Sequence, residues 1–237
     1  MRKFFYDTEF CEGVQQNLDK PTIDLISIGI VDEEGNEYYA ISNSFNLSNV
    51  WWKNDNTISE PVYWLRENVL KKVFNDLRKL DVHDIYDEFT LDNLYALLSN
   101  HGKSNYTIQK EILDFIKPSK ESPVELYGYY SAYDHVVLCW LFGKMIDLPE
   151  GMPMYTIDLK QMIDIKANDV INYICYSSGN HTIWNREEAL NFIKSQDDYP
   201  KQSNEHNALD DAKWNLELYK FLTDHEDCVY KYTYKKS

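Results

Sequence analysis

Alternating apolar and polar positions predict three strands at the beginning of the chain. Such runs, bounded by polar residues, are typical of β-structure because side chains alternate between the two faces of a strand. The predicted strands comprise residues 4–10, 23–31 and 36–42. The turn DEEG at 32–35 joins the last two as a hairpin, and a polar loop at 11–22 separates the first two.

From residue 60 to residue 117 the apolar residues recur at helical spacing. Pro61 suits the first turn of a helix whose apolar face consists of Val62, Leu65, Val69, Val73 and Leu77. The pattern predicts further helices at 91–100, 107–118, 131–145, 159–166, 186–195 and 208–222. It also predicts a buried strand at 124–130, a short strand at 155–159, and an otherwise irregular, polar stretch at 168–204.

This order of elements predicts an α/β fold. A leading antiparallel meander followed by βα units gives a mixed sheet with helices packed on its faces. The 237 residues suffice for one domain with a substantial core, spanning 1–237. The stretches 81–106 and 168–204 are the expected insertions in that domain.

Composition narrows the class of protein. A hydrophobic fraction of 43% and an aromatic fraction of 15% describe a folded globular chain. Widely spaced cysteines without a CxxC pair indicate a reducing, cytoplasmic setting, and no apolar run approaches the ~18 residues that cross a membrane. The net charge of −15 argues against binding long nucleic acid through its phosphates.

Asp7 and Glu9 share one face of the first predicted strand, whereas Phe4, Tyr6, Thr8 and Phe10 lie on the other. Two like charges side by side repel unless water or a cation separates them. The pair therefore indicates either a solvent-facing edge strand or a metal site. The same Asp-x-Glu spacing occurs twice more, as an acidic chain supplies by chance, but only this pair lies in a strand with aromatic neighbours.

Asp134 has two interpretations. Ser131 and Asp134 have the spacing of a capping box at the start of the helix predicted after 130. That helix also follows a buried strand directly, and open α/β sheets place ligand sites at such positions.

His206 stands just before the last predicted helix, five residues ahead of Asp211. Asn207 could cap that helix with Asp210 at its third position, so either aspartate could merely complement the helix dipole. His206 alone could be an ordinary surface histidine.

Considered together, the four carboxylates and the histidine indicate a metal site. Each carboxylate stands in a strand or at a helix start beside one. At ~4 Å, each like-charged pair costs roughly 4 kcal/mol at an effective dielectric of 20. Oxygen-rich sites bind hard divalent cations such as Mg²⁺ or Mn²⁺, and these remove that cost.

The same residues resemble the motifs of a known family. Three short motifs together resemble those of the DEDDh 3′–5′ exonucleases, which have a ribonuclease H-like fold. The motifs are Asp7-x-Glu9, Tyr133-Asp134 and His206-x-x-x-x-Asp211. HNALDDAKW is similar to the third motif of oligoribonucleases. Four further segments resemble a narrower branch, the mycobacterial polyadenylate-specific exoribonuclease (ribonuclease AS) type. They are FFYDTEF, IDLISIGIV, EYYAIS and AYDHVVLCWLFG. The resemblance covers residues 3–70, 107–165 and the last helix.

The resemblance implies a metal-dependent 3′–5′ exoribonuclease that degrades single-stranded or short RNA and releases nucleoside 5′-monophosphates. Asp7 would bridge two Mg²⁺ or Mn²⁺ ions, and Glu9 and Asp211 would complete the shell of one ion. Asp134 would serve the other ion, directly or through water. His206 would be the general base, because an imidazole accepts a proton near neutral pH.

An enzyme that grips only a 3′ end needs few phosphate contacts, which reconciles the acidic composition with a nucleic-acid substrate. Stacking on aromatic residues would add affinity for any sequence. The candidates are Phe10, Tyr133 and the Trp51–Trp52 pair. A basic cluster, which a solvated helix face explains equally well, comprises Lys71, Lys72, Arg78 and Lys79. A homodimer is expected from analogy alone.

Three alternatives stay open at the level of sequence. A 3′–5′ DNA exonuclease of the proofreading type would carry the same motifs, since no residue visibly reads the 2′-hydroxyl of RNA. A catalytically inactive, nuclease-like binding module would not need all five residues. A structural protein with a chance acidic cluster is the third alternative.

Overall fold

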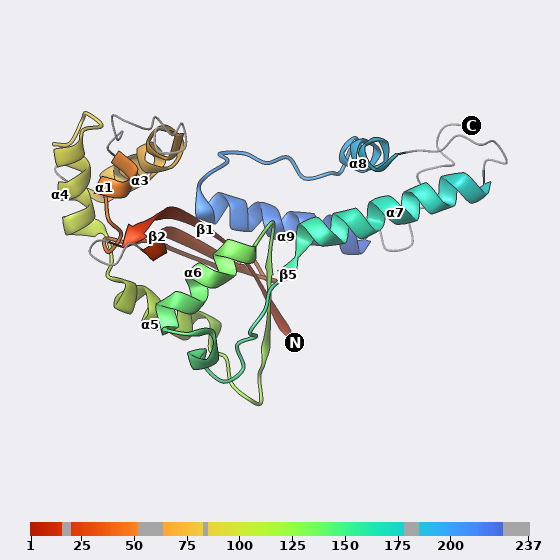
Figure 1. Cartoon of the computed structure of the whole chain (residues 1–237), viewed down its shortest axis with the longest axis horizontal. Coiled ribbons are helices and arrows are strands. Elements are labelled where there is room, and N and C mark those ends of the chain that lie inside the picture. The colour runs from red at the N-terminus through yellow and green to blue at the C-terminus, as the bar shows by residue number, and fades with distance from the viewer. Residues whose placement is uncertain (16–19, 52–63, 83–84, 178–184, 225–237) are drawn as a thin grey trace.

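The computed structural model describes residues 1–15, 20–51, 64–82, 85–177 and 185–224 (Figure 1). Within them, five strands form one mixed sheet of order β3-β2-β1-β4-β5. The strands are β1 (Arg2–Gln15), β2 (Lys20–Asp32), β3 (Glu37–Ile41), β4 (Val124–Gly128) and β5 (Ile157–Asp158). The first three are antiparallel, and β4 and β5 run parallel to β1, as the order of elements predicted.

The hairpin between β1 and β2 is longer than the hydrophobic pattern predicted. Residues 11–15 and 20–22, expected in a polar loop, continue the ladder, in which Cys11 pairs with Asp24 and Glu12 with Ile23. The prediction was wrong because ladder pairing satisfies backbone groups whatever the polarity of the side chains. The predicted turn at 32–35 is confirmed, and Gly35 adopts a φ of 87° there.

Helices cover both faces of the sheet (Figure 1). α9 (Ala208–Asp224) lies along one face, and α5 (Asn105–Ile116) and α6 (Ala132–Phe142) cover the other. The alternation predicted for β1 sorts the core accordingly. Phe5 belongs to the apolar cluster beneath α9, whereas Phe4 and Tyr6 pack with α5 and α6.

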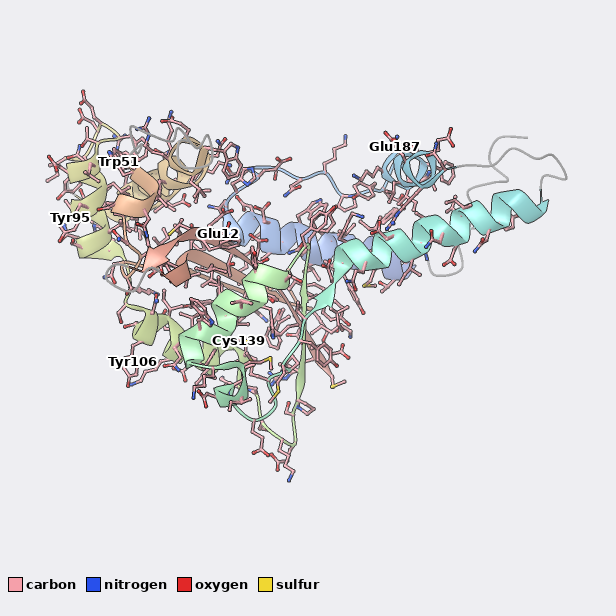
Figure 2. All side chains as sticks on the ribbon, in the orientation of Figure 1. Glu12, Trp51, Tyr95, Tyr106, Cys139 and Glu187 are labelled. Atoms are coloured by element: carbon pink, nitrogen blue, oxygen red, sulfur yellow. The ribbon has the colours of Figure 1, made fainter. Side chains whose placement is uncertain are left out.

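A third group of helices packs at one end of the sheet (Figure 1). It consists of α1 (Ser48–Trp51), a π-helical turn η1 (Arg66–Leu70), α3 (Lys71–Leu80) and α4 (Leu91–His101). Val69, Val73 and Leu77 are buried, as their spacing predicted, while Trp52, Pro61 and Val62 lie outside the described residues. Tyr95 of α4 and Tyr106 of α5 project outward (Figure 2).

α7 (Leu159–Ser177) is the largest departure from the expected elements. It projects away from the sheet with α8 (Arg186–Lys194) beside it, and it continues well into the stretch expected to be irregular (Figure 1). Ile163, Ala167 and Val170 are buried at helical spacing, so the helix has an apolar stripe that the polar residues around it conceal.

The helix predicted at 131–145 ends earlier than expected, at Phe142. Gly143 follows with a φ of 112°, which a residue with a side chain rarely adopts, and a short 3₁₀ turn, η2 (Met145–Asp147), comes next. Over the described residues, no helix combines the length and the apolar character that crossing a bilayer requires.

Candidate active site

Asp7 and Glu9 of β1 meet Asp211 from the first turn of α9. One carboxylate oxygen of each residue lies within 4.8 Å of the others. Glu9 and Asp211 are 9% and 7% exposed, and Asp7 is partly buried. The structure thus excludes the simple solvent-facing edge strand and brings the N-terminal acids to the last helix.

Gly29 allows α9 to approach the sheet at this point. It pairs with Asp7 across the β1–β2 ladder, and a Cβ at position 29 would lie 2.3 Å from the carbonyl oxygen of Ala208. The backbone of the first helical turn therefore packs directly on β2. One turn further, the buried Asn215 donates from Nδ2 to the carbonyl of Tyr6 at 3.0 Å. Both contacts fix Asp211 beside Asp7.

Asp134 lies at the start of α6 and is 6% exposed. Its Oδ1 accepts hydrogen bonds from the backbone N–H of Thr8 at 3.0 Å and from Thr8 Oγ1 at 2.6 Å. The pairing of β1 with β4 ends at Phe5, so Asp134 satisfies a backbone donor that the sheet leaves free. This carboxylate therefore ties α6 to the strand that carries Asp7 and Glu9.

Of the two interpretations of Asp134, the capping box with Ser131 is wrong. Ser131 makes no capping hydrogen bond, and its buried Oγ has no partner within the described residues. The backbone of Ser131 has a ψ of 16°, whereas capping residues usually have extended geometry. The carboxylate of Asp134 faces Thr8 instead of the helix start.

Burial and mutual repulsion disfavour the charged forms of the three clustered carboxyls. Burial, followed by repulsion from Asp134, Glu9 and Asp211, raises the pKa of Asp7 well above its usual value. Burial and repulsion from Asp211 and Asp134 raise the pKa of Glu9 to about 8, although Lys72 opposes the rise. Burial also raises the pKa of Asp211.

The pKa of Asp134 follows the same logic. Burial raises it to about 6, while the hydrogen bonds from Thr8 favour the carboxylate and limit the rise. The positive charge around the buried acids is thus too small to offset the rise in their pKa values. A set of hard oxygen donors short of positive charge fits a divalent cation.

His206 lies in the turn that leads into α9. Its backbone N–H donates to Asp211 Oδ2 at 2.8 Å, and its ring packs edge-on against Trp64 with 4.6 Å between centroids. The predicted cap is confirmed, since Asn207 Oδ1 accepts from the backbone N–H groups of Leu209 and Asp210 at 3.2 Å each. The first turn of α9 thus places Asp211, rather than Asp210, in the acidic cluster.

Phe10 and Tyr133, the expected stacking residues, lie next to each other. Their rings form an edge-to-face pair with centroids 5.9 Å apart, and Tyr133 is 50% exposed. Each follows or precedes an acid of the site, Glu9 and Asp134 respectively. Trp51 instead packs against Phe89 with 5.1 Å between centroids.

Four residues that support the site were not predicted from the sequence to be site residues. Thr8 holds Asp134, Asn215 anchors α9, and Gln202 donates from Nε2 to Asp211 Oδ1 at 2.6 Å. Lys72 donates a hydrogen bond to the carbonyl of Glu205, and this contact with the turn before α9 sets it apart from a lysine on a merely solvated helix face. Thr8 alone leaves a signal in the sequence, as the polar residue on an otherwise aromatic strand face.

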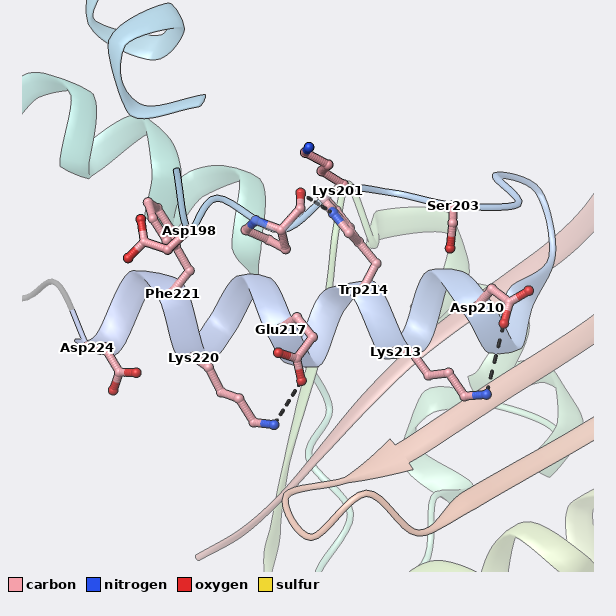
Figure 3. Close-up of a pocket in the computed structure, with 11 residues that line it drawn as sticks. Asp198, Lys201, Ser203, Asp210, Lys213, Trp214, Glu217, Lys220, Phe221 and Asp224 are labelled. Carbon is pink, nitrogen blue, oxygen red and sulfur yellow. Dashed lines mark hydrogen bonds and ion pairs between the residues drawn. The ribbon is translucent and has the colours of Figure 1, made fainter. Parts of the chain in front are cut away.

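A separate groove runs along the outer side of α9, with a volume of about 490 Å³ (Figure 3). Acids and lysines alternate along it, and Asp210 lines it. Glu217 lies 2.8 Å from Lys220 there. The acids of this groove are accompanied by lysines and differ in this respect from the acidic cluster on the inner side of the same helix.

Comparison with known proteins points to one family. A family model described as the 3′–5′ exoribonuclease Rv2179c-like domain matches residues 2–223. Two Mycobacterium tuberculosis proteins, 3′–5′ exoribonuclease Rv2179c (strain ATCC 25618 / H37Rv) and 3′–5′ exoribonuclease MT2234.1 (strain CDC 1551 / Oshkosh), are each 32% identical over 160 residues. The alignment covers 68% of this chain and 73% of each relative.

A solved structure supports the fold. The zinc-bound form of the E. coli ExoI–ssDNA complex aligns with a TM-score of 0.50 at 13% identity and covers 99% of this chain. The chain spans 43% of the length of that protein. With the observed strand order, this similarity agrees with the ribonuclease H-like fold expected from the sequence.

Proposed function

This chain belongs to the Rv2179c-like 3′–5′ exoribonuclease domain family, and we propose that it removes nucleotides from the 3′ end of single-stranded or short RNA. The family is one of hydrolases of the exonuclease class. The products are nucleoside 5′-monophosphates. The stretches 81–106 and 168–204 are insertions in this single exonuclease domain.

The convergence of Asp7, Glu9 and Asp211 carries the proposal. Their ligand atoms come within 4.8 Å of one another, and Asp134 lies close enough to raise the pKa of Asp7. Buried like charges are unfavourable unless a cation compensates them. A cluster of this kind is consistent with a metal-dependent phosphodiesterase and has no evident use in packing.

Two divalent cations, Mg²⁺ or Mn²⁺, fit this donor set. Asp7, Glu9 and Asp211, with Asp134 beside them, would hold these ions. When bound, such ions stabilise the charge that develops on the oxygens of the reacting phosphodiester. Thr8 keeps the carboxylate of Asp134 oriented through its two hydrogen bonds.

His206 is the general base in this proposal. Its imidazole accepts the proton of the attacking water on a ring nitrogen. The backbone N–H of His206 is held by Asp211, and the ring is flanked by Trp64, so the base has a defined place beside the acids. The Phe10–Tyr133 pair provides an aromatic surface for the terminal bases.

Few phosphate contacts are needed for a substrate gripped at its end. The net charge of −15 is compatible with that mode of binding, and we expect activity on short strands to depend only weakly on salt. A steep salt dependence would indicate many phosphate contacts and contradict this mode.

A homodimer is part of the proposal. Trp140, Met145, Ile146 and Tyr155 are exposed large apolar residues in and after α6, with exposures between 48% and 69%. In a homodimer, a second copy of the chain would cover exposed apolar side chains such as these. Light scattering after size-exclusion chromatography would show twice the chain mass, whereas a monomer at all concentrations would remove this part of the proposal.

The decisive experiment incubates end-labelled RNA and DNA oligomers of several lengths with Mg²⁺ or Mn²⁺. Stepwise shortening from the 3′ end, abolished by chelator and reduced about 10²–10⁴-fold in His206→Ala, is the expected result. RNA should be preferred over DNA of the same sequence. Internal cleavage, or loss from the 5′ end, would overturn the proposal.

A further inference from the structure

Lys72 stands apart from the other lysines of α3. Its ammonium group donates a hydrogen bond to the carbonyl oxygen of Glu205, the residue before His206. Its charge also lowers the pKa values of Glu9 and Asp211, which places it beside the acidic cluster. By contrast, Lys71 is more exposed and lies 3.9 Å from Glu67.

The turn that Lys72 contacts has an unusual backbone. Asn204 and His206 have φ values of 55° and 66°, in the left-handed region that residues with side chains seldom adopt. Such a conformation persists where surrounding contacts determine it. Within the turn, Asn204 Nδ2 donates to Asp210 Oδ2 at 2.6 Å, and His206 N–H donates to Asp211.

The helix that carries Lys72 makes a second contact with this turn. Trp64, in the helical turn before η1, packs its ring edge-on against the His206 ring with 78° between the planes. Residues 64 and 72 are eight apart, whereas two α-helical turns contain roughly 7.2 residues. The wider π-helical turn η1 between them absorbs the difference, so that Trp64 and Lys72 face the same turn.

We propose that Lys72 is a positioning residue that holds the 204–206 turn, and with it His206, in place over the acidic cluster. The Glu205 carbonyl and the His206 N–H belong to one peptide unit, so the hydrogen bond from Lys72 and the hydrogen bond to Asp211 together fix the plane of the peptide that precedes the His206 side chain. The inference rests on the proposed function, because it gives His206 the role of general base.

The first test needs no catalysis. Hydrogen exchange of the His206 amide is compared in the wild type, Lys72→Met, Lys72→Arg and the control Lys71→Met. Loss of a hydrogen bond from a charged donor should speed exchange at least about tenfold in Lys72→Met. Lys72→Arg should retain most of the protection, and Lys71→Met all of it. Equal exchange in Lys72→Met and Lys71→Met would overturn the inference.

A second test asks whether Lys72 acts through His206. Lys72→Met should lower kcat about tenfold or more with KM within twofold, and the same substitution should change kcat less than twofold in a His206→Ala background. An undiminished loss in that background, or a change confined to KM, would mean that Lys72 acts on substrate directly and would refute a positioning role.

A measurement of Mn²⁺ affinity distinguishes a positioning role of Lys72 from a general disruption of the acidic cluster. Removing a positive charge beside Glu9 and Asp211 should leave Mn²⁺ affinity unchanged or increase it, as measured by calorimetry. Weaker Mn²⁺ binding in Lys72→Met than in Lys71→Met would contradict the inference. If the wild type releases no mononucleotides, the proposed function fails, while the exchange experiment still decides whether Lys72 holds the turn.

Discussion

The two sides of α9 hold their acids in opposite ways. On the outer side, Glu217 lies 2.8 Å from Lys220, and both side chains are about half exposed to water (Figure 3). On the inner side, Asp211 lies against Asp7 and Glu9, and the carboxylates of these three share one buried cluster. Solvated opposite charges need no ligand, whereas buried like charges favour a cation. Burial with too little counter-charge, rather than acidity itself, therefore distinguishes the candidate site.

The largest expected effect comes from removing an inner acid. Asp211→Asn should lower kcat/KM for RNA about 10³-fold or more, because bound metal contributes several kcal/mol to transition-state stabilisation. It should also remove most of the rise in melting temperature caused by Mn²⁺. The outer-side control Glu217→Gln should change kcat/KM less than twofold. Comparable losses in the two variants, measured as mononucleotide release, would abolish the contrast between the two sides.

The inner acids should also make the metal-free protein sensitive to pH. The pKa of Glu9 is about 8 in the fold, against an ordinary value of 4.5, so the folded state binds more protons than the unfolded state between those pH values. The free energy of unfolding should therefore fall as pH rises from 4.5 to 8, by roughly 2–4 kcal/mol.

Urea denaturation in chelator at several pH values measures this fall. Saturating Mn²⁺ and the variant Glu9→Gln should each flatten it, while Glu217→Gln should leave it unchanged. A metal-free stability that is constant or rises over this range would show that the cluster is compensated by other charges.

Gly29→Ala should push α9 away from the sheet, and with it Asp211 away from Asp7 and Glu9. The added Cβ would meet the backbone of Ala208 and Leu209, which cannot move without shifting α9, so a loss of about 1–3 kcal/mol in the free energy of unfolding is expected. The stabilisation by Mn²⁺ should weaken as well.

Gly35→Ala is the matched control, because a Cβ at Gly35 meets nothing within 4 Å. An alanine at position 35 would have to adopt the φ of 87° that Gly35 adopts, so the free energy of unfolding should fall, but the response to Mn²⁺ should persist. Retention of the full Mn²⁺ response in Gly29→Ala would show that the close approach of α9 does not set the geometry of the cluster.

The smallest effect is expected on the outer side. Lys220→Ala removes an exposed ion pair three residues apart on α9, and it should change the free energy of unfolding by no more than about 0.5 kcal/mol. Urea denaturation at low and high salt tests this. A change above 1 kcal/mol would indicate that the outer acids, too, depend on their partners.

Much of the local structure follows from the sequence alone. The period-two pattern at 4–10 places Asp7 and Glu9 on one face and Phe4 and Tyr6 on the other, as observed in the sheet. Asn207 is a recognisable cap, and it fixes where α9 begins. These features are local, because side-chain spacing reports which face an element buries and capping depends on residues three or four positions apart.

The meeting of distant segments was decided by tertiary structure. The sequence named Asp211 as a site residue but left open that it merely complements the helix dipole, and the packing of α9 on Gly29 brings it to Asp7. It suggested a capping role for Asp134, yet the carboxylate satisfies the Thr8 backbone at the open edge of β1. Periodicity carries no information on helix-to-sheet distance or on unpaired strand edges, since both depend on contacts between residues far apart in the chain.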